Sequence, residues 1–120
     1  MNESTRRSVA YIVGRALAET GSQAVYDYAV GEHFFFGGTL TRTHVSIYDY
    51  DEGCYITGSG DGQEFSLFHY GNGGHISLTV ETGSFNGFDY DSSSHFSGNV
   101  NGSVVWVFDY ELSEWFSYSV

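Results

Sequence analysis

Carboxylate side chains recur in this chain at a fixed spacing, each inside an aromatic triplet. From Tyr48 onwards, successive triplets begin 20 residues apart, and most carry Asp at the centre and a second acid two residues later. Residues i and i+2 of a strand share a face, and alternate strands of a sheet lie about 9.5–10 Å apart. The pattern therefore predicts a row of carboxylates along one edge of a sheet, able to bind basic side chains. Its core members are Asp49, Asp51, Asp89, Asp91, Asp109 and Glu111.

Glu52 and Glu114 extend this predicted row, which we call the acidic rim. We expect its carboxylates to be exposed and to bind a partner, with no residue of the chain acting as a catalyst. His69 interrupts the rim in one repeat, and the opposite edge carries only three acids, Asp61, Glu64 and Glu81. Two interpretations stay open. The acids either serve solubility and protect sheet edges, or they imitate the phosphates of a nucleic acid.

Other constellations that could support chemistry are weaker. The five histidines form no helical i, i+4 pair and no Cys/His cluster, although His75 and His95 fall in one column of the repeat. The glycine-rich segment 58–62 lacks the Lys and the helix of a phosphate-binding loop, so we expect a hairpin turn. Cys54, the single cysteine, is expected to be a small buried residue. We predict no metal site and no cofactor.

The elements that hold these acids follow from the same period. Twenty residues are enough for two strands of about 6–8 residues with two turns. Phe, Tyr, Val, Ile and Thr fill the blocks, and Gly, Asn, Asp and Ser separate them. Each block is therefore predicted to be a β-hairpin, which gives an antiparallel meander of nine or ten strands from about residue 23 to residue 120. The aromatic residues of the triplets, beginning with Tyr48 and Tyr50, lie on one of its faces. The other face carries Val45, Ile47, Phe65, Leu67, Phe85, Val105 and Val107.

The N-terminal segment has a different period. Val9, Ile12, Val13, Ala16 and Leu17 have the spacing of an amphipathic helix. Ser4 is a candidate N-cap and Gly21 a candidate stop. We therefore predict a mainly β (α+β) fold in one domain, 1–120. A helix within 1–21 packs on the meander of 22–120, which is curved or barrel-like, and both an open sheet and a closed barrel remain possible.

Composition excludes several classes of function. The chain has 120 residues, fifteen Asp and Glu against four Arg and no Lys, and a formal charge of −11. Such a charge disfavours direct binding to nucleic acids or anionic membranes. The segment after Arg6 and Arg7 is amphipathic and does not read as a signal peptide, and one cysteine fits a reducing compartment. We expect a cytoplasmic protein.

In size, lack of Lys, β-rich composition and acidic rim, the chain resembles phage-encoded inhibitors that imitate DNA, including some anti-CRISPR proteins. The resemblance implies a non-enzymatic inhibitor in the host cytoplasm that blocks the basic DNA- or RNA-binding surface of a nuclease or CRISPR-type surveillance complex. Two alternatives remain. One is a β-barrel that binds a small ligand or a carbohydrate, because Tyr and Phe beside Asp and Asn can stack on sugars. The other is an immunity protein against a basic toxin nuclease.

Overall fold

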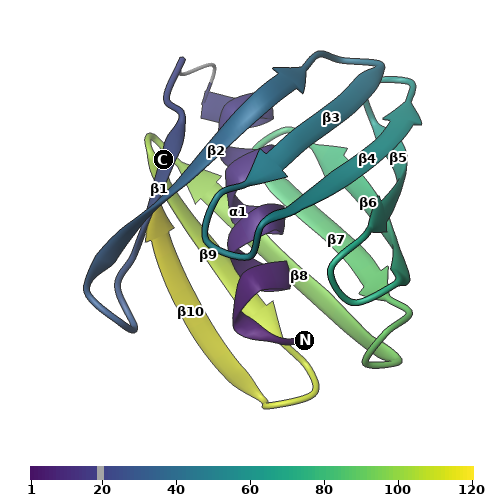
Figure 1. The fold of residues 1–120 in the computed structure, drawn as a ribbon. Coiled ribbons are helices and arrows are strands. Elements are labelled where there is room, and N and C mark those ends of the chain that lie inside the picture. Colours follow the sequence, from purple (N-terminus) through teal and green to yellow (C-terminus); the bar gives the residue numbers. More distant parts are fainter. Residues whose placement is uncertain (19–20) are drawn as a thin grey trace.

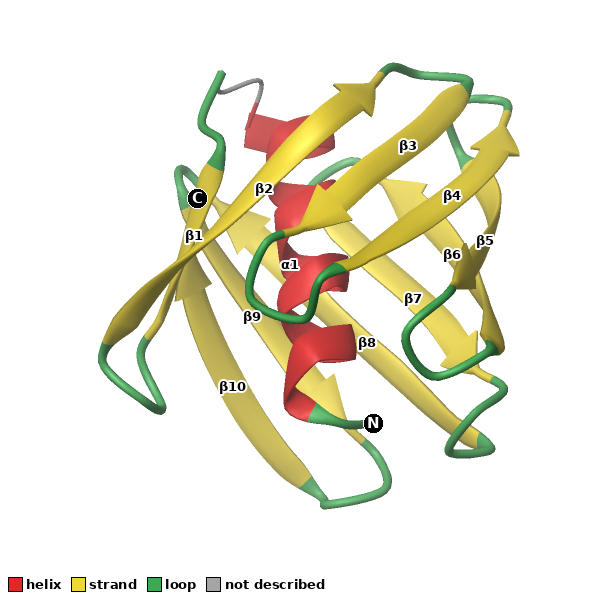
Figure 2. Cartoon of the chain, viewed as in Figure 1, coloured by secondary structure: helices red, strands yellow, loops and turns green. Residues whose placement is uncertain are grey.

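Each 20-residue block of the sequence forms one hairpin of a closed antiparallel barrel. The computed structural model describes residues 1–18 and 21–120, and in it ten strands surround one helix (Figures 1 and 2). Every strand pairs with its neighbours in the chain, and β1 closes the barrel against β10. The elements are α1 (Glu3–Ala18), β1 (Ala24–Asp27), β2 (Glu32–Leu40), β3 (His44–Asp49), β4 (Cys54–Gly60), β5 (Glu64–His69), β6 (Gly74–Glu81), β7 (Ser84–Asp89), β8 (Ser94–Asn101), β9 (Val104–Asp109) and β10 (Glu114–Ser119). The predicted meander is confirmed, and the barrel is closed.

Strand alternation separates an apolar interior from an aromatic exterior. In β3, Val45 and Ile47 are buried, whereas Ser46 and Tyr48 between and beside them are only half-buried. The residues predicted for the first face all point inward and are buried, namely Val45, Ile47, Phe65, Leu67, Phe85, Val105 and Val107. This face needs cover, and α1 supplies it from within the barrel.

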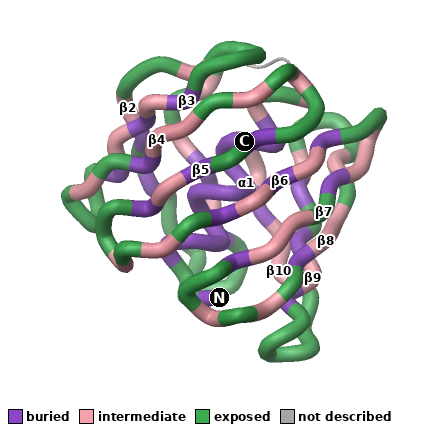
Figure 3. The backbone as a smooth tube through the Cα atoms, turned by 90° about the vertical axis from the view of Figure 1, so that its right-hand side faces the viewer, coloured by how far each residue is buried: buried purple, intermediate pink, exposed green. Residues whose placement is uncertain are grey.

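The helix lies inside the barrel and is not docked on one face of an open sheet. Val9, Ala10 and Val13 are fully buried, and so are Thr5 and Ser8 on other sides of the helix. Figure 3 shows α1 as a buried segment enclosed by the strands. Small residues let it fit: a Cβ added at Gly14 would lie 2.6 Å from Cγ2 of Val120. At the far end of the helix Ala16 is exposed and Leu17 is only partly buried.

The cap of the helix differs from the prediction. Asn2, not Ser4, is the N-cap: its Oδ1 accepts the backbone N–H of Thr5 at 2.8 Å and the hydroxyl of Ser4 at 3.0 Å. Ser4 lies inside the first turn, because the helix begins at Glu3. The helix ends at Ala18, and Gly21 comes after two residues that lie outside the described part of the chain.

The aromatic exterior is covered mainly by its own rings. The two aromatic residues of each triplet meet edge to face, with centroids 5.2 Å apart in Tyr48–Tyr50 and 4.8 Å apart in Phe88–Tyr90. The second ring of each pair stays open to solvent, 65% exposed in Tyr50 and 59% in Tyr90. The barrel therefore carries a belt of exposed aromatic rings near the edge where the triplets end.

Candidate functional site

The central residue of each triplet points into the barrel, which corrects the predicted acidic rim. Asp49, Asp89 and Asp109 are only 1%, 1% and 0% exposed, so these three carboxylates are not available to a partner. The reason is strand parity: Asp49 lies two residues after Ile47 and four after Val45, on the same inward face. Asp27 and His69 occupy the equivalent buried positions in their repeats.

These buried residues hold the turns that follow them. The Oδ1 atoms of Asp27, Asp49, Asp89 and Asp109 accept a backbone N–H two residues later in the chain, at 3.0–3.2 Å. In the third repeat His69 takes over this role, since its Nδ1 accepts the N–H of Asn72 at 3.3 Å. The central residue of the triplet is thus a turn cap, and the acid that follows it belongs to the turn and not to the strand.

Two arginines of the helix neutralise part of this buried charge. Nη1 of Arg6 lies 2.9 Å from Oδ2 of Asp109, and Nη1 of Arg7 lies 3.5 Å from Oδ2 of Asp27. Both guanidinium groups also stack on inward rings, Arg6 at 3.8 Å from the Phe116 centroid and Arg7 at 3.7 Å from that of Phe34. Sequence reasoning missed these pairs, although two adjacent arginines in a helix otherwise poor in charge were a signal of buried counter-ions.

We call the five inward-pointing residues Asp27, Asp49, His69, Asp89 and Asp109 the buried ring, and burial shifts the pKa of two of them. Burial raises the pKa of Asp49 above 3.8, against the opposing effect of hydrogen bonds from the backbone N–H groups of Glu52 and Asp51. Burial lowers the pKa of His69 below 6.5, although the charges of Asp49, Glu52 and Asp89 oppose this. Among the described residues, Oδ2 of Asp49 and Nε2 of His69 have no hydrogen-bond partner. Burial therefore favours the neutral form of His69, against the effect of the surrounding carboxylates.

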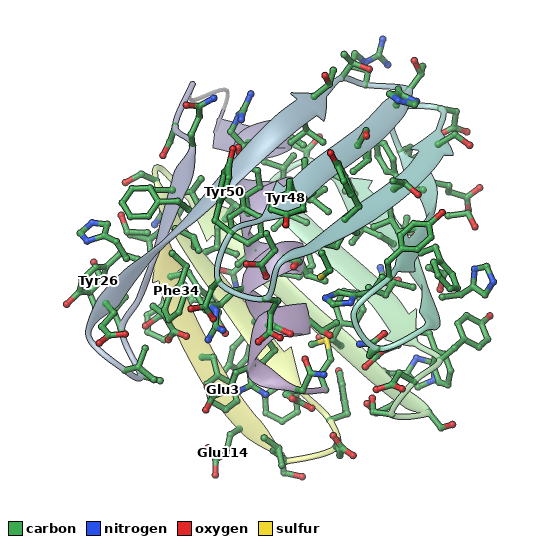
Figure 4. The ribbon with its side chains drawn as sticks, viewed as in Figure 1. Glu3, Tyr26, Phe34, Tyr48, Tyr50 and Glu114 are labelled. Carbon is green, nitrogen blue, oxygen red and sulfur yellow. The ribbon has the colours of Figure 1, made fainter. Side chains whose placement is uncertain are left out.

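The exposed acids nevertheless concentrate at one end of the barrel. We call this end, where the triplet turns and the start of α1 lie, the acidic end. Of the predicted rim, Asp51, Glu52, Asp91, Glu111 and Glu114 are exposed there, joined by Glu3 and Glu32. Glu3 and Glu114 project from it in Figure 4. No exposed cation lies there in the described part of the chain, because Arg6 and Arg7 are buried.

Three acids of this end also contact the buried cations. Asp51 lies 3.4 Å from Nη2 of Arg7, and Glu3 lies 3.6 Å from Nη1 of the same side chain. Glu111 pairs with the amino group of Met1. The opposite end of the barrel carries Asp61, Glu64 and Glu81 together with both remaining arginines, Arg15 and Arg42. Charge is therefore distributed unequally between the two ends.

Two hollows mark the rest of the surface. A shallow groove of about 390 Å³ lies on the outer face of β8, β9 and β10, lined by Asn99, Trp106 and Trp115. The two indole side chains are 42% and 54% exposed, and Asn99 is the cross-strand neighbour of Trp106. The second hollow, of about 920 Å³, lies at the mouth of the barrel opposite the acidic end.

The histidines and the cysteine considered in the sequence have contacts of their own. Within 1–18 and 21–120, no group of three or more His, Cys, Asp or Glu side chains could hold a metal ion. His75 and His95 each pack edge to face on a neighbouring ring, Phe68 and Phe88 respectively. Cys54 is half-buried, and burial raises the pKa of its thiol.

Comparison with known protein families, curated proteins and solved structures finds no significant match. Among the described residues, no helix has both the length and the apolar character needed to cross a membrane.

Proposed function

We propose that the protein is a non-enzymatic inhibitor whose acidic end binds the basic nucleic-acid-binding surface of another protein. The observation that carries this proposal is the segregation of charge. The acidic end presents seven exposed carboxylates, Glu3, Glu32, Asp51, Glu52, Asp91, Glu111 and Glu114. The arginines nearest to them are buried in the barrel. A basic partner would therefore meet negative charge without competing exposed cations.

The turns that carry these acids are held in place before any partner arrives. Asp49 accepts the backbone N–H groups of both Asp51 and Glu52, at 3.0 and 3.2 Å, and Asp109 accepts that of Glu111 at 3.0 Å. A carboxylate on a fixed turn loses less conformational freedom on binding than one on a flexible tail. The repeat also sets equivalent turns two strands apart, about 9.5–10 Å. The turns after Asp49, Asp89 and Asp109 carry exposed acids, which supports imitation of a phosphate backbone, and the turn after His69 carries none.

The partner class follows from the same electrostatics. A nuclease or CRISPR-type surveillance complex has a channel lined with Arg and Lys for its nucleic acid, and the acidic end would occupy that channel. An immunity protein against a basic toxin nuclease would use the same contacts. The competition experiment therefore applies both to a nuclease or surveillance complex and to a toxin nuclease as the partner.

The test is competition between this protein and target DNA for a candidate nuclease complex. The triple variant Asp51→Asn/Asp91→Asn/Glu111→Gln should weaken inhibition by about 10- to 100-fold at low salt, because exposed charges chiefly govern association. The matched control Asp61→Asn/Glu64→Gln/Glu81→Gln removes the same charge from the opposite end and should inhibit nearly as well as the parent. Inhibition should also fall steeply with ionic strength.

Two results would contradict the proposal. Equal losses from the two triple variants would mean that net charge alone acts, without a defined binding surface. Absence of competition with DNA at low salt, for every nuclease complex co-purified from the source cell, would end the mimic interpretation.

A second candidate function is carbohydrate binding at the groove between Trp106 and Trp115. It is favoured by one observation, the two exposed indole side chains with the amide of Asn99 beside them. Flat rings can stack on the apolar faces of a sugar while an amide bonds its hydroxyl groups. Binding of a neutral sugar would not fall with salt, which separates it from the acidic inhibitor.

A further inference from the structure

The mouth of the barrel forms a cavity that lies apart from the acidic end and takes no part in the proposed inhibitor function. It has a volume of about 920 Å³ and lies where α1 ends, opposite the acidic end. The β2–β3, β4–β5 and β6–β7 hairpins surround it, contributing Thr41 and Arg42, Gly62 and Gln63, and Glu81 and Thr82. Cavities that hold small molecules in proteins have volumes of about 300–1,000 Å³.

The cavity wall is apolar toward the inside of the barrel. Ile12, Phe65 and Val80 line it and are 1–6% exposed. Leu17 and Leu40 also line it. Both pack against the core and are only partly buried. A ligand with an apolar body would cover these two side chains, and removing apolar surface from water is favourable.

Among the described lining residues, the polar part of the cavity carries more positive than negative charge. Arg15 and Arg42 both line it, with Glu81 as the one acid among the described lining residues. Nη1 of Arg15 donates to the hydroxyl of Tyr11 at 2.6 Å and to the carbonyl of Ser22 at 3.0 Å, which fixes the plane of the guanidinium group. These bonds use only one of its nitrogens, and a guanidinium has five N–H donors.

Arg42 is the exposed member of this pair. Its guanidinium lies beside Gly62 in the β4–β5 turn, where a Cβ would come within 2.6 Å of Nη2. The hydrogen bonds from the backbone N–H groups of Glu64 and Gln63 lower the pKa of Asp61 most, and the charge of Arg42 lowers it further by a smaller amount. Within the described residues Arg42 forms no ion pair within 4 Å. In a chain of charge −11, both arginines outside the buried ion pairs line this one cavity.

We propose that this cavity binds a small amphiphilic anion, a free carboxylic acid in its ionised form with an unbranched or compact apolar body. The carboxylate would accept charge-assisted hydrogen bonds from Arg15 and Arg42, and the apolar body would lie on Leu17, Leu40 and Phe65. This inference is independent of the proposed inhibitor function, because the two sites occupy opposite ends of the barrel.

The probe is decanoate below its micelle concentration at pH 7.5, measured by titration calorimetry against the full chain, with decan-1-ol as the uncharged analogue. Decanoate should saturate one site, and decan-1-ol should bind at least about tenfold more weakly. Arg42→Gln should weaken decanoate binding about tenfold or more and leave decan-1-ol binding unchanged. Ala16→Trp, at an exposed lining position of α1, should fill the cavity and abolish both.

Glu114→Gln, at the acidic end, is the matched control and should bind decanoate like the parent. A thermal melt checks that each variant is folded. If Ala16→Trp does not fold, Arg42→Gln still tests the proposal. The proposal is overturned if decanoate shows no saturable binding, or if decan-1-ol binds equally well. It is also overturned if Arg42→Gln has no effect, or if folded Ala16→Trp still binds. None of these results bears on the competition with DNA.

Discussion

One repeat position holds four aspartates, and three of them, Asp49, Asp89 and Asp109, cap the same kind of turn but differ in their other partners, which gives a graded prediction. Asp→Asn preserves the cap in each case, because the amide oxygen can accept the same backbone N–H. It removes only the charge. At Asp109 that charge is paired: Arg6 lies 2.9 Å away and the amino group of Met1 3.4 Å away, with Asp109 fully buried. Asp109→Asn therefore leaves a buried guanidinium without its counter-ion.

The magnitude follows from these contacts. Breaking one side of a buried ion pair costs about 3–5 kcal/mol. Arg6 keeps its hydrogen bond to the carbonyl of Met1 at 2.7 Å and its stacking on Phe116, so we expect the lower end, about 3 kcal/mol. A domain is stabilised by about 5–15 kcal/mol in total. The melting temperature should fall by about 10 °C or more.

The two sister variants should cost much less. Oδ2 of Asp89 accepts the hydroxyl of Ser92 at 2.8 Å and has no arginine within ion-pair distance among the described residues. Asp89→Asn replaces the charged hydrogen bond between Ser92 and the carboxylate by a neutral one, and it should cost about 1 kcal/mol or less of stability. Oδ2 of Asp49 has no described partner, and burial raises the pKa of this carboxyl. Asp49→Asn removes a poorly compensated charge and should change stability by no more than about 0.5 kcal/mol, or raise it.

The assay is urea unfolding of the three single variants at pH 7, comparing the free energies of unfolding and checking that the m-value stays constant. The expected order of loss is Asp109→Asn, then Asp89→Asn, then Asp49→Asn. Equal losses in all three would mean that the carboxylates act only as turn caps. A largest loss at Asp49 would refute the assignment of the ion pairs.

Two further predictions concern other features of the barrel. The pKa of His69 is lower in the folded protein than its ordinary 6.5, so the folded state binds fewer protons, and stability should be lost as pH falls below about 6.5. The variant His69→Asn keeps a turn cap and should remove this loss of stability in thermal melts between pH 7.5 and 5.0. An unchanged loss would exclude His69 as its source. If the Trp106–Trp115 groove binds neutral oligosaccharides, titration should change the tryptophan fluorescence, and Trp115→Ala should abolish binding measured by calorimetry; retained binding would place the sugar elsewhere.

Much of the fold was predictable because each repeat has the same strand lengths and the same alternation of inward and outward side chains. Five triplets at nearly constant spacing define the hairpins, and alternate residues after Val45 define the buried set. The same parity also places Asp49 inside, since it continues the series Val45, Ile47, Asp49. The prediction of an exposed carboxylate is wrong there because strand parity, and not residue type, decides which face the side chain occupies. Buried acids are unusual unless they are paired or hydrogen-bonded.

Closure around the helix was harder to predict. The spacing of Val9, Ile12 and Val13 shows one apolar stripe, whereas burial on every side also depends on small residues such as Ser8 and Gly14 that fit against the wall. A helix with one stripe can equally cover an open sheet. The cavity was not predictable either, because three hairpin turns and the end of α1 must meet in space to form it.

The break in the repeat at His69 has an explanation in the charge balance of the barrel interior. Five turn caps point inward, and the helix brings two arginines, which pair with Asp27 and Asp109. Asp49 and Asp89 already lie in the buried ring without an arginine within ion-pair distance among the described residues. A fifth aspartate between them would add buried charge next to two like charges, which is costly. A neutral histidine at this position caps its turn through Nδ1, at 3.3 Å from the N–H of Asn72, and adds no charge. The residue that interrupts the acidic pattern thus limits the charge that a ten-stranded barrel with two internal arginines must bury.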